Sequence, residues 1–419
     1  MITKKFIRLN LIKKIDLIVF VLLGLLAVLY GTFSYPWPRT VGWAEVLVGV
    51  GLLLLVGING VAIGLDWKEI KNQVPNIPIN ISFIFVYILI VPLITGMTYG
   101  WQMADVIRDV IPLMYMFLPL LAGHLFIQSA TLWRERISFL AGIVGVLFSV
   151  RFFLYPQTLT GNLFYFPQAP EVLFGAVYWL LKGLRSPLKS LSTWFYFIMG
   201  ITCFTATLLF IQRAEVGLII IAILIMTILS KQVRKRIIAF LLITGCILLF
   251  IGLFSDFGPK LFSVVVTQLT NLVRKTRITG FNGKDLEMLG VVKTVMQNNF
   301  LFGVGWGSLF FSPILNDSEV RFTHSWLTYM FLKSGVIGLI LILGYIFWLT
   351  KPILNRLIKY SIKDEIILPS LLGGCVVLLQ GILFQTIYKT LGFGFILLIL
   401  FLIRFHEKEN NLEGSKPGL

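Results

Sequence analysis

Long apolar runs, each close to the length of a membrane-crossing helix, constrain this chain more than any other feature. The first run, Ile15 to Tyr30, follows a basic start, and no small-residue cleavage site ends it, so we expect it to be retained as the first span. About 20 apolar residues cross the hydrocarbon core as a helix, which satisfies its own backbone hydrogen bonds. The sequence therefore predicts an all-α polytopic membrane protein.

The composition agrees with this class. Hydrophobic residues make up 57% of the 419-residue chain and charged residues 13%, whereas about a quarter of a soluble domain is charged. The apolar runs and the basic turns between them indicate about twelve transmembrane helices, of which the sixth is short and could be tilted or partly re-entrant. Their expected ranges are about 15–33, 41–64, 81–99, 109–128, 137–155, 171–184, 191–211, 216–230, 237–254, 324–349, 366–386 and 390–404.

Lysines and arginines set the expected orientation. The formal net charge of +17 comes mostly from turns that this topology places inside, which is the positive-inside pattern and needs no nucleic acid. We therefore expect a lipid bilayer and no nucleic acid as partner, with both termini cytoplasmic. The predicted organisation is transmembrane helices 1–9 in residues 1–254, a large outer loop in 255–322, helices 10–12 in 323–404 and a cytoplasmic tail in 405–419.

Motifs for metal or cofactor binding do not stand out. Cys203, Cys246 and Cys375 each fall within an apolar run, where cysteine acts as a small buried hydrophobe. No aspartate-rich pair stands in an outer loop, and no Walker, HExxH or G-x-S-x-G motif occurs. We expect no metal site and no cofactor.

The large outer loop contains two recognisable elements. Asn282-Gly283 is a turn signal, and the acids and spaced apolar residues after it predict an amphipathic helix of about 12 residues that ends at Asn298-Asn299. The next run contains Gly303, Gly305 and Gly307. No strand–helix unit surrounds these glycines, so they do not indicate a dinucleotide site. We expect them to allow either close backbone approach to a ligand or a chain reversal.

Basic residues on the outer side need a reason other than orientation. Arginine binds phosphate with two parallel hydrogen bonds, so a diphosphate ligand is one explanation, while lipid headgroups and local ion pairs are the other. Arg213, at a tight outer turn, is either a ligand-binding residue or an interfacial anchor. Arg108 is either a ligand-binding residue or the partner of Asp105. The full outer set is Arg39, Arg108, Arg151, Arg213, Lys260, Arg274, Lys275, Arg277, Lys284, Lys293, Arg321 and Lys389.

His324 is the histidine placed for chemistry on the outer side. If the chain is helical there, Arg321 and His324, three residues apart, share one face and one pocket. An imidazole can accept a proton from a hydroxyl nucleophile at neutral pH, although a lone histidine is commonly structural. Lys333, deeper in the same predicted span, could be buried against a carboxylate.

Residues 210–340 resemble the bacterial O-antigen ligase and polymerase superfamily. An outer arginine closely followed by glycine (Arg213 and Gly217) ends a span, and one large outer loop precedes span ten. The loop resembles the family pattern "GR…W…PLLGVG", and the segment after it resembles "HN…L…GLIG". The matching residues are Gly283-Lys284, Leu289, 298–305, His324-Ser325-Trp326-Leu327 and 335–338. Lys284 replaces the usual arginine and Phe302 the usual Pro-Leu pair, so Arg274 and Arg277 are reserve candidates for the loop arginine.

The resemblance implies a GT-C-like fold with short amphipathic helices in a periplasmic loop, and a location in the bacterial inner membrane. It further implies a metal-independent transfer of a glycan from an undecaprenyl-diphosphate carrier to a sugar hydroxyl. His324 would activate the acceptor hydroxyl, and Arg213 and Arg321 would stabilise the diphosphate. The other expected donor-binding residues are Arg108, Arg274, Arg277, Lys284, Gly303 and Gly305.

Three functions remain open at this point. A ligase would use lipid A–core as acceptor, and a polymerase would use a second lipid-linked glycan; one large outer loop favours the ligase. A transporter or flippase for a lipid-linked sugar would also need outer arginines. It should also show internal repeats and charged residues at mid-membrane depth, and the sequence shows no repeat.

Overall fold

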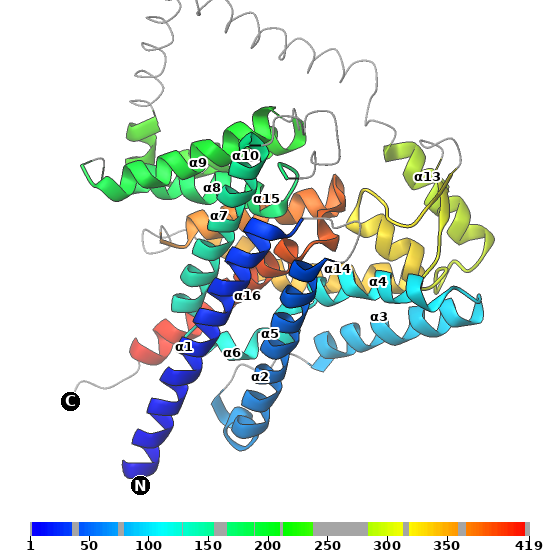
Figure 1. Ribbon diagram of the computed structural model, residues 1–419, viewed down its shortest axis with the longest axis horizontal. Coiled ribbons are helices and arrows are strands. Elements are labelled where there is room, and N and C mark those ends of the chain that lie inside the picture. The colour runs from blue at the N-terminus through cyan, green and yellow to red at the C-terminus, as the bar shows by residue number, and fades with distance from the viewer. Residues whose placement is uncertain are drawn as a thin grey trace, which may run out of the picture.

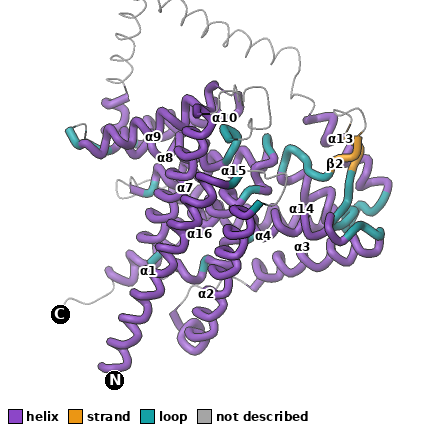
Figure 2. Tube along the Cα trace, in the orientation of Figure 1, coloured by secondary structure: helices purple, strands orange, loops and turns teal. Residues whose placement is uncertain are grey.

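The computed structural model describes residues 2–35, 42–73, 79–127, 129–154, 166–187, 189–209, 213–237, 284–312, 318–358 and 366–414. This part of the chain is mostly helical, with one two-stranded antiparallel sheet at its edge (Figure 2). In that sheet β1 (Phe310–Ser312) pairs with β2 (Ser318–Val320), and Phe311 lies opposite Glu319.

The helices follow the predicted apolar runs closely in most places (Figure 1). Their bounds are α1 Ile2–Phe33, α2 Trp43–Gln73, α3 Ile79–Thr98, α4 Met103–Met116, α5 Leu118–Ala122, α6 His124–Ile127, α7 Ala130–Leu154, α8 Pro170–Arg185, α9 Leu191–Leu209, α10 Arg213–Leu229, α13 Lys284–Gln297, α14 Trp326–Ile358, α15 Leu368–Leu383 and α16 Leu391–Gly414, with a 3₁₀ turn, η4, at Thr386–Lys389.

Six of the described helices are long and apolar enough to cross a membrane: α1, α2, α3, α7, α9 and α14. In each of the helices α1, α2, α3 and α9, only 28% of the residues in the apolar segment are buried inside the protein. Large apolar side chains such as Leu25 and Leu53 are exposed. An exposed apolar surface of this extent is unstable in water and suits contact with lipid. A helical membrane protein is the class that fits this surface.

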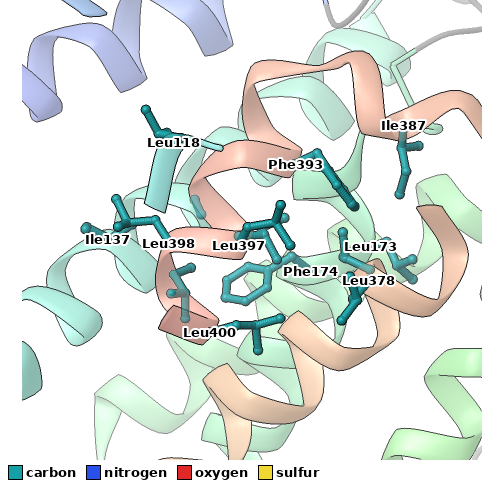
Figure 3. Close-up of a cluster of buried hydrophobic side chains, with 14 of the residues drawn as sticks. Leu118, Ile137, Leu173, Phe174, Leu378, Ile387, Phe393, Leu397, Leu398 and Leu400 are labelled. Atoms are coloured by element: carbon teal, nitrogen blue, oxygen red, sulfur yellow. The ribbon is translucent and has the colours of Figure 1, made fainter. Parts of the chain in front are cut away.

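Shorter apolar helices form the centre of the molecule. Helix α8, 16 residues long, is buried on almost every side and packs against α7, α9 and α15. Phe174 of α8 lies among side chains of α15 and α16, including Leu378, Leu397 and Leu400 (Figure 3). Nearly all of its residues are buried, including the acidic Glu171 in its first turn.

Glycines let the central helices approach closely. A Cβ atom at Gly145 of α7 would lie 2.1 Å from the carbonyl oxygen of Glu171 at the start of α8. A Cβ at Gly200 of α9 would lie 2.8 Å from the backbone nitrogen of Leu180. Close helix contacts through small residues are the usual packing device in membranes, where apolar burial gives no preference for protein over lipid.

The predicted span at 109–128 is wrong as a continuous helix. The structure has α4, α5 and α6 in this region, with breaks at Phe117 and Gly123. Pro119 accounts for the break at Phe117, because proline cannot donate a backbone hydrogen bond and its ring crowds the preceding turn. Phe117 adopts φ −102° and ψ 13°, and α5 starts with the proline in its first turn. The predicted span at 237–254 lies outside the described residues beyond Ile237.

Helix α14 is broken at Gly335, which has φ 64° and ψ −161°. The loop at 300–305 pairs with the backbone groups that this break frees. Val304 and Gly305 donate to the carbonyls of Leu332 (2.9 Å) and Lys333 (3.0 Å), and Val336 donates to the carbonyl of Phe300 (3.1 Å). Irregular backbone inside a membrane protein is tolerated where such partners are present. Backbone hydrogen bonds therefore hold the loop at 300–305 against α14.

Candidate functional site

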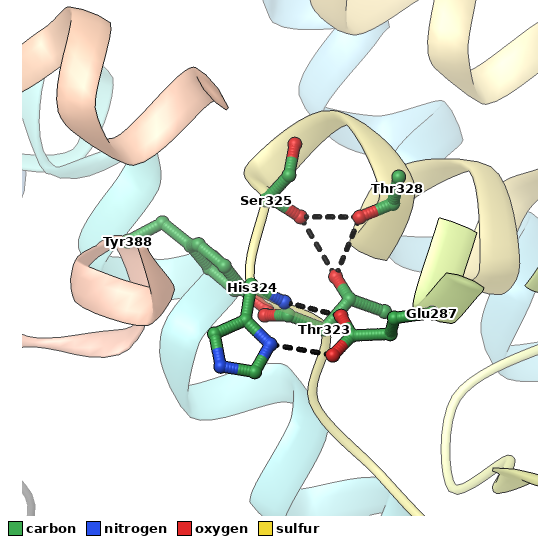
Figure 4. Close-up of polar contacts among 6 residues, drawn as sticks. All are labelled: Glu287, Thr323, His324, Ser325, Thr328 and Tyr388. Atoms are coloured by element: carbon green, nitrogen blue, oxygen red, sulfur yellow. Dashed lines mark hydrogen bonds and ion pairs between the residues drawn. The ribbon is translucent and has the colours of Figure 1, made fainter. Parts of the chain in front are cut away.

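His324 lies two residues before α14 and faces helix α13 (Figure 4). Its Nδ1 atom is 2.5 Å from Oε2 of Glu287, and its backbone N–H donates to Oε1 of the same carboxylate at 2.6 Å. The Glu287 side chain is 6% exposed, whereas that of His324 is 49% exposed. One carboxylate thus fixes both the ring and the backbone of His324 and leaves the Nε2 side of the ring directed away from Glu287.

A compact hydrogen-bond network holds the turn that presents His324. The Thr323 hydroxyl donates to the carbonyl of Ser325 at 2.7 Å, and the Thr328 hydroxyl donates to the same carbonyl at 3.0 Å. From the C-terminal region, the Tyr388 hydroxyl donates to the carbonyl of Thr323 at 2.8 Å. Because partners before, within and after the turn all hold it, the imidazole is placed by a rigid support (Figure 4).

The helical relationship expected between Arg321 and His324 is absent. Residues 321–325 are not helical, since α14 starts at Trp326. Arg321 instead points its Nη2 atom at Oδ1 of Asp105 on α4, 2.5 Å away, and its side chain is 12% exposed. Asp105 therefore pairs with Arg321 and not with Arg108, which is exposed on α4. The two residues proposed from their spacing have different partners on different helices.

A second ion pair lies one turn further along α4. Lys333 Nζ is 2.7 Å from Oδ2 of Asp109, and both side chains are fully buried. Lys333 also donates to the carbonyl of Ser308 at 2.6 Å, while the Gly307 N–H donates to Asp109 at 2.6 Å. The expectation that Lys333 is buried against a carboxylate is confirmed. The pair joins α14, α4 and the glycine loop at one point.

Gly303 and Gly305 serve packing between segments of this chain. Both have positive φ, 73° and 81°. A Cβ on Gly303 would lie 2.5 Å from the nitrogen of Gly335, and a Cβ on Gly305 would lie 2.2 Å from the nitrogen of Gly96 on α3. The backbone does approach closely at both glycines, but the neighbour is the protein's own backbone and not the ligand that was expected. The geometry therefore does not favour Gly303 and Gly305 as ligand-binding residues.

The remaining predicted residues are described only in part. Arg213 is the first residue of α10 and Lys284 the first residue of α13, and their side chains lie outside what the structure describes, as do Arg274 and Arg277 altogether. The start of α10 does border the site. Glu215 accepts a hydrogen bond from Gln380 of α15 at 2.5 Å, and nearby Ile382 accepts one from Ser325 at 2.5 Å.

Other basic residues of the outer set have local roles. Arg151 donates to the carbonyls of Gly31 (3.0 Å) and Ser34 (2.6 Å), which joins the ends of α7 and α1. Lys389 in η4 lies beside the His324 turn, with Nζ 4.5 Å from the centre of the Phe322 ring. Burial lowers the pKa of Lys389 to about 8, because the charged ammonium loses hydration there.

Sequence reasoning missed the residues that support the site. From the sequence, Glu287 is only one of the acids near the start of a predicted helix, and Asp105 is only a possible partner for Arg108. Their actual partners, His324 and Arg321, are far away in the sequence, so no local spacing reveals them. Among the described residues, no group of three or more His, Cys, Asp or Glu side chains is arranged to hold a metal ion.

The imidazole, half exposed and held at Nδ1 by a buried carboxylate, therefore has its Nε2 atom free for proton exchange at the start of an apolar helix. Searches against protein-family models and curated proteins find no match to this chain.

Proposed function

We propose that this protein is a metal-independent membrane glycosyltransferase that moves a glycan from an undecaprenyl-diphosphate carrier to a sugar hydroxyl on the periplasmic side of the bacterial inner membrane. The observation that carries the proposal is the His324–Glu287 pair, with Nδ1 of the ring 2.5 Å from the carboxylate. A carboxylate at Nδ1 selects the tautomer with its proton on that nitrogen, so the Nε2 lone pair is directed outward as a base.

In this mechanism His324 removes the proton from the acceptor hydroxyl while the hydroxyl oxygen attacks the anomeric carbon of the donor. The bond from that carbon to the diphosphate oxygen breaks, and the diphosphate departs with the negative charge. Positive side chains stabilise this charge without a proton transfer to the leaving group. Since Asp105 already partly neutralises Arg321, we assign the larger share of this stabilisation to Arg213.

Transfer onto lipid A–core, the ligase reaction, is the favoured form of the proposal, and polymerisation with a second lipid-linked glycan is the alternative. Purified protein incubated with undecaprenyl-diphosphate glycan, with and without lipid A–core, separates the two. A glycan on the core indicates a ligase, and longer chains without core indicate a polymerase. His324→Ala should lower transfer by roughly 10²- to 10⁴-fold, the usual contribution of a general base, with unchanged membrane insertion. Transfer at the wild-type rate by this variant would refute the assignment.

The metal-independent step has its own test. Transfer should persist in excess EDTA, since arginines supply the positive charge in the proposed mechanism. Loss of transfer that is restored by Mg²⁺ would contradict it.

A lipid-linked-sugar transporter is the second candidate, and one observation favours it. Lys333 and Asp109 form a fully buried ion pair within the helices, and ionisable residues inside a membrane protein frequently line a transport path. Proteoliposomes that contain a fluorescent undecaprenyl-diphosphate glycan distinguish the two functions. A transporter moves the lipid between leaflets without any acceptor, whereas a transferase produces a glycosylated acceptor and no such movement.

A further inference from the structure

A small cavity lies among helices α1, α7, α8 and α16, apart from the His324 site. It has a volume of about 40 Å³. Its walls are almost entirely hydrocarbon, from side chains that include Leu26, Val144 and Phe395. A dry apolar cavity would need no explanation, but this one also contains two polar groups.

The polar groups are the Glu171 carboxylate and the Tyr30 hydroxyl, with 2% and 7% residue exposure. Oε2 of Glu171 and the oxygen of Tyr30 are buried and make no hydrogen bond of ordinary geometry, although the two groups lie near enough to interact with each other. A buried polar atom without a partner costs free energy, so native proteins rarely retain two at one place without a use. Gly392 makes room for the carboxylate, because a Cβ there would fall 1.7 Å from Oε1.

The outer edge of the cavity faces the apolar surface of the protein. Ala27, Leu140 and Phe395 line it and are partly exposed, whereas most of the other lining residues are buried. On α1, Leu25 near Ala27 is 65% exposed on the surface that we assign to lipid. A molecule in the bilayer would therefore enter the cavity past these three side chains.

The chemistry of the walls selects the occupant. None of the described lining residues is Lys, Arg or His, so a phosphate headgroup would meet a carboxylate with no compensating cation. A single water would find only these two polar groups, the lower end of the two to four partners that a buried water takes, and would leave the apolar walls without contacts. A hydroxyl at the end of a hydrocarbon chain fits both the polar groups and the apolar walls. The hydroxyl donates to Oε2 of Glu171 and accepts from Tyr30, and the methylenes contact the walls.

We propose that this cavity binds the hydroxyl end of a long-chain lipid alcohol that enters from the bilayer. The site does not depend on the glycosyltransferase assignment, because it shares no residue with the His324 site.

The test uses the full-length protein in phosphatidylcholine nanodiscs with a photoreactive hexadecanol that carries a diazirine near its hydroxyl. Crosslinked peptides, mapped by mass spectrometry, should come from the cavity walls in α1, α7 and α16. Unlabelled hexadecanol should compete, and hexadecyl phosphate should not. No labelling at the walls, or equal competition by both lipids, would overturn the proposal and leave water as the occupant.

Three variants, one of them a control, test the site further. Ala27→Phe narrows the entrance and should lower labelling at least about tenfold, a change of about 1.4 kcal/mol in binding free energy. Leu25→Phe, on the exposed face of the same helix, is the matched control and should label as the wild type does. Glu171→Leu should retain the hydrocarbon chain but lose the preference for hexadecanol over hexadecane. Equal labelling of Ala27→Phe and wild type would contradict the site; if Ala27→Phe does not fold, the competition experiment decides.

Discussion

Lys333 on α14 and Asp109 on α4 form an ion pair of 2.7 Å from which solvent is fully excluded. The same two side chains contact the glycine loop, through the carbonyl of Ser308 and the N–H of Gly307. This pair therefore fixes the outer loop to two helices at once. It lies one helical turn from Asp105, which holds Arg321 at the surface of the site.

Removal of one member of this pair should destabilise the protein strongly. Lys333→Met leaves a buried carboxylate without its partner, for which a cost of about 3–5 kcal/mol is typical. The double variant Lys333→Met/Asp109→Leu should recover more than half of that loss, because no unpaired charge remains. Thermal unfolding in detergent, followed by size-exclusion chromatography, measures the stabilities of the wild type, the two single variants and the double variant. Additive effects of the two substitutions would show that the ion pair is not the source of the loss.

Gly305→Ala should also destabilise the protein, through the backbone. Its φ is 81°, a conformation that costs a residue with a Cβ roughly 1–2 kcal/mol. The new Cβ would in addition press on the Gly96 nitrogen at 2.2 Å. Gly57→Ala in α2 is the control, since nothing lies within 4 Å of a Cβ there, and alanine favours a helix. If both variants unfold at the same temperature, the loop at 300–307 is not tightly packed.

The sequence predicted the apolar helices, the helix after Asn282-Gly283 and the burial of Lys333 because each leaves a local pattern. Periodicity and caps placed the outer helix near its observed bounds, Lys284–Gln297. Glycine spacing indicated a close backbone approach but not its partner. A glycine run allows contact with any surface, and here α3 and α14 occupy the space that a ligand would need.

The pairing of charges was not predictable in the same way. Arg321 was placed with His324 on the assumption of a helix, but the Thr323 and Thr328 hydroxyls close the turn at Ser325 and the helix starts afterwards. The true partners, Asp105 and Glu287, come from other helices. Which carboxylate reaches which cation depends on the packing of α4, α13 and α14, and a single sequence does not contain that information.

Glu287→Gln should show whether the Glu287 carboxylate supports catalysis by His324 or only holds the fold around it. The amide keeps the size of the side chain and one acceptor but loses the charge that stabilises a protonated ring. We expect kcat for glycan transfer to fall by roughly tenfold to a hundredfold, less than for loss of the base itself, with little change in KM for the donor.

The control for this variant is Glu319→Gln, an exposed carboxylate on β2 in the same outer segment. It should leave kcat unchanged. A wild-type kcat in Glu287→Gln would remove the reason to treat the His324–Glu287 pair as catalytic.

Lys389 gives a prediction for stability against pH. Its pKa in the folded protein is about 8, below the ordinary value of 10.5. Between these two values the unfolded chain holds the proton and the folded chain does not, so folding is favoured increasingly as the pH rises through this window. Below the window the buried ammonium is a constant cost, which Lys389→Met removes. The variant should therefore unfold at a higher temperature than the wild type at pH 7.5, and this advantage should shrink by pH 9.5. Thermal unfolding at the two pH values measures it, and a difference independent of pH would show that Lys389 is well hydrated in the folded protein.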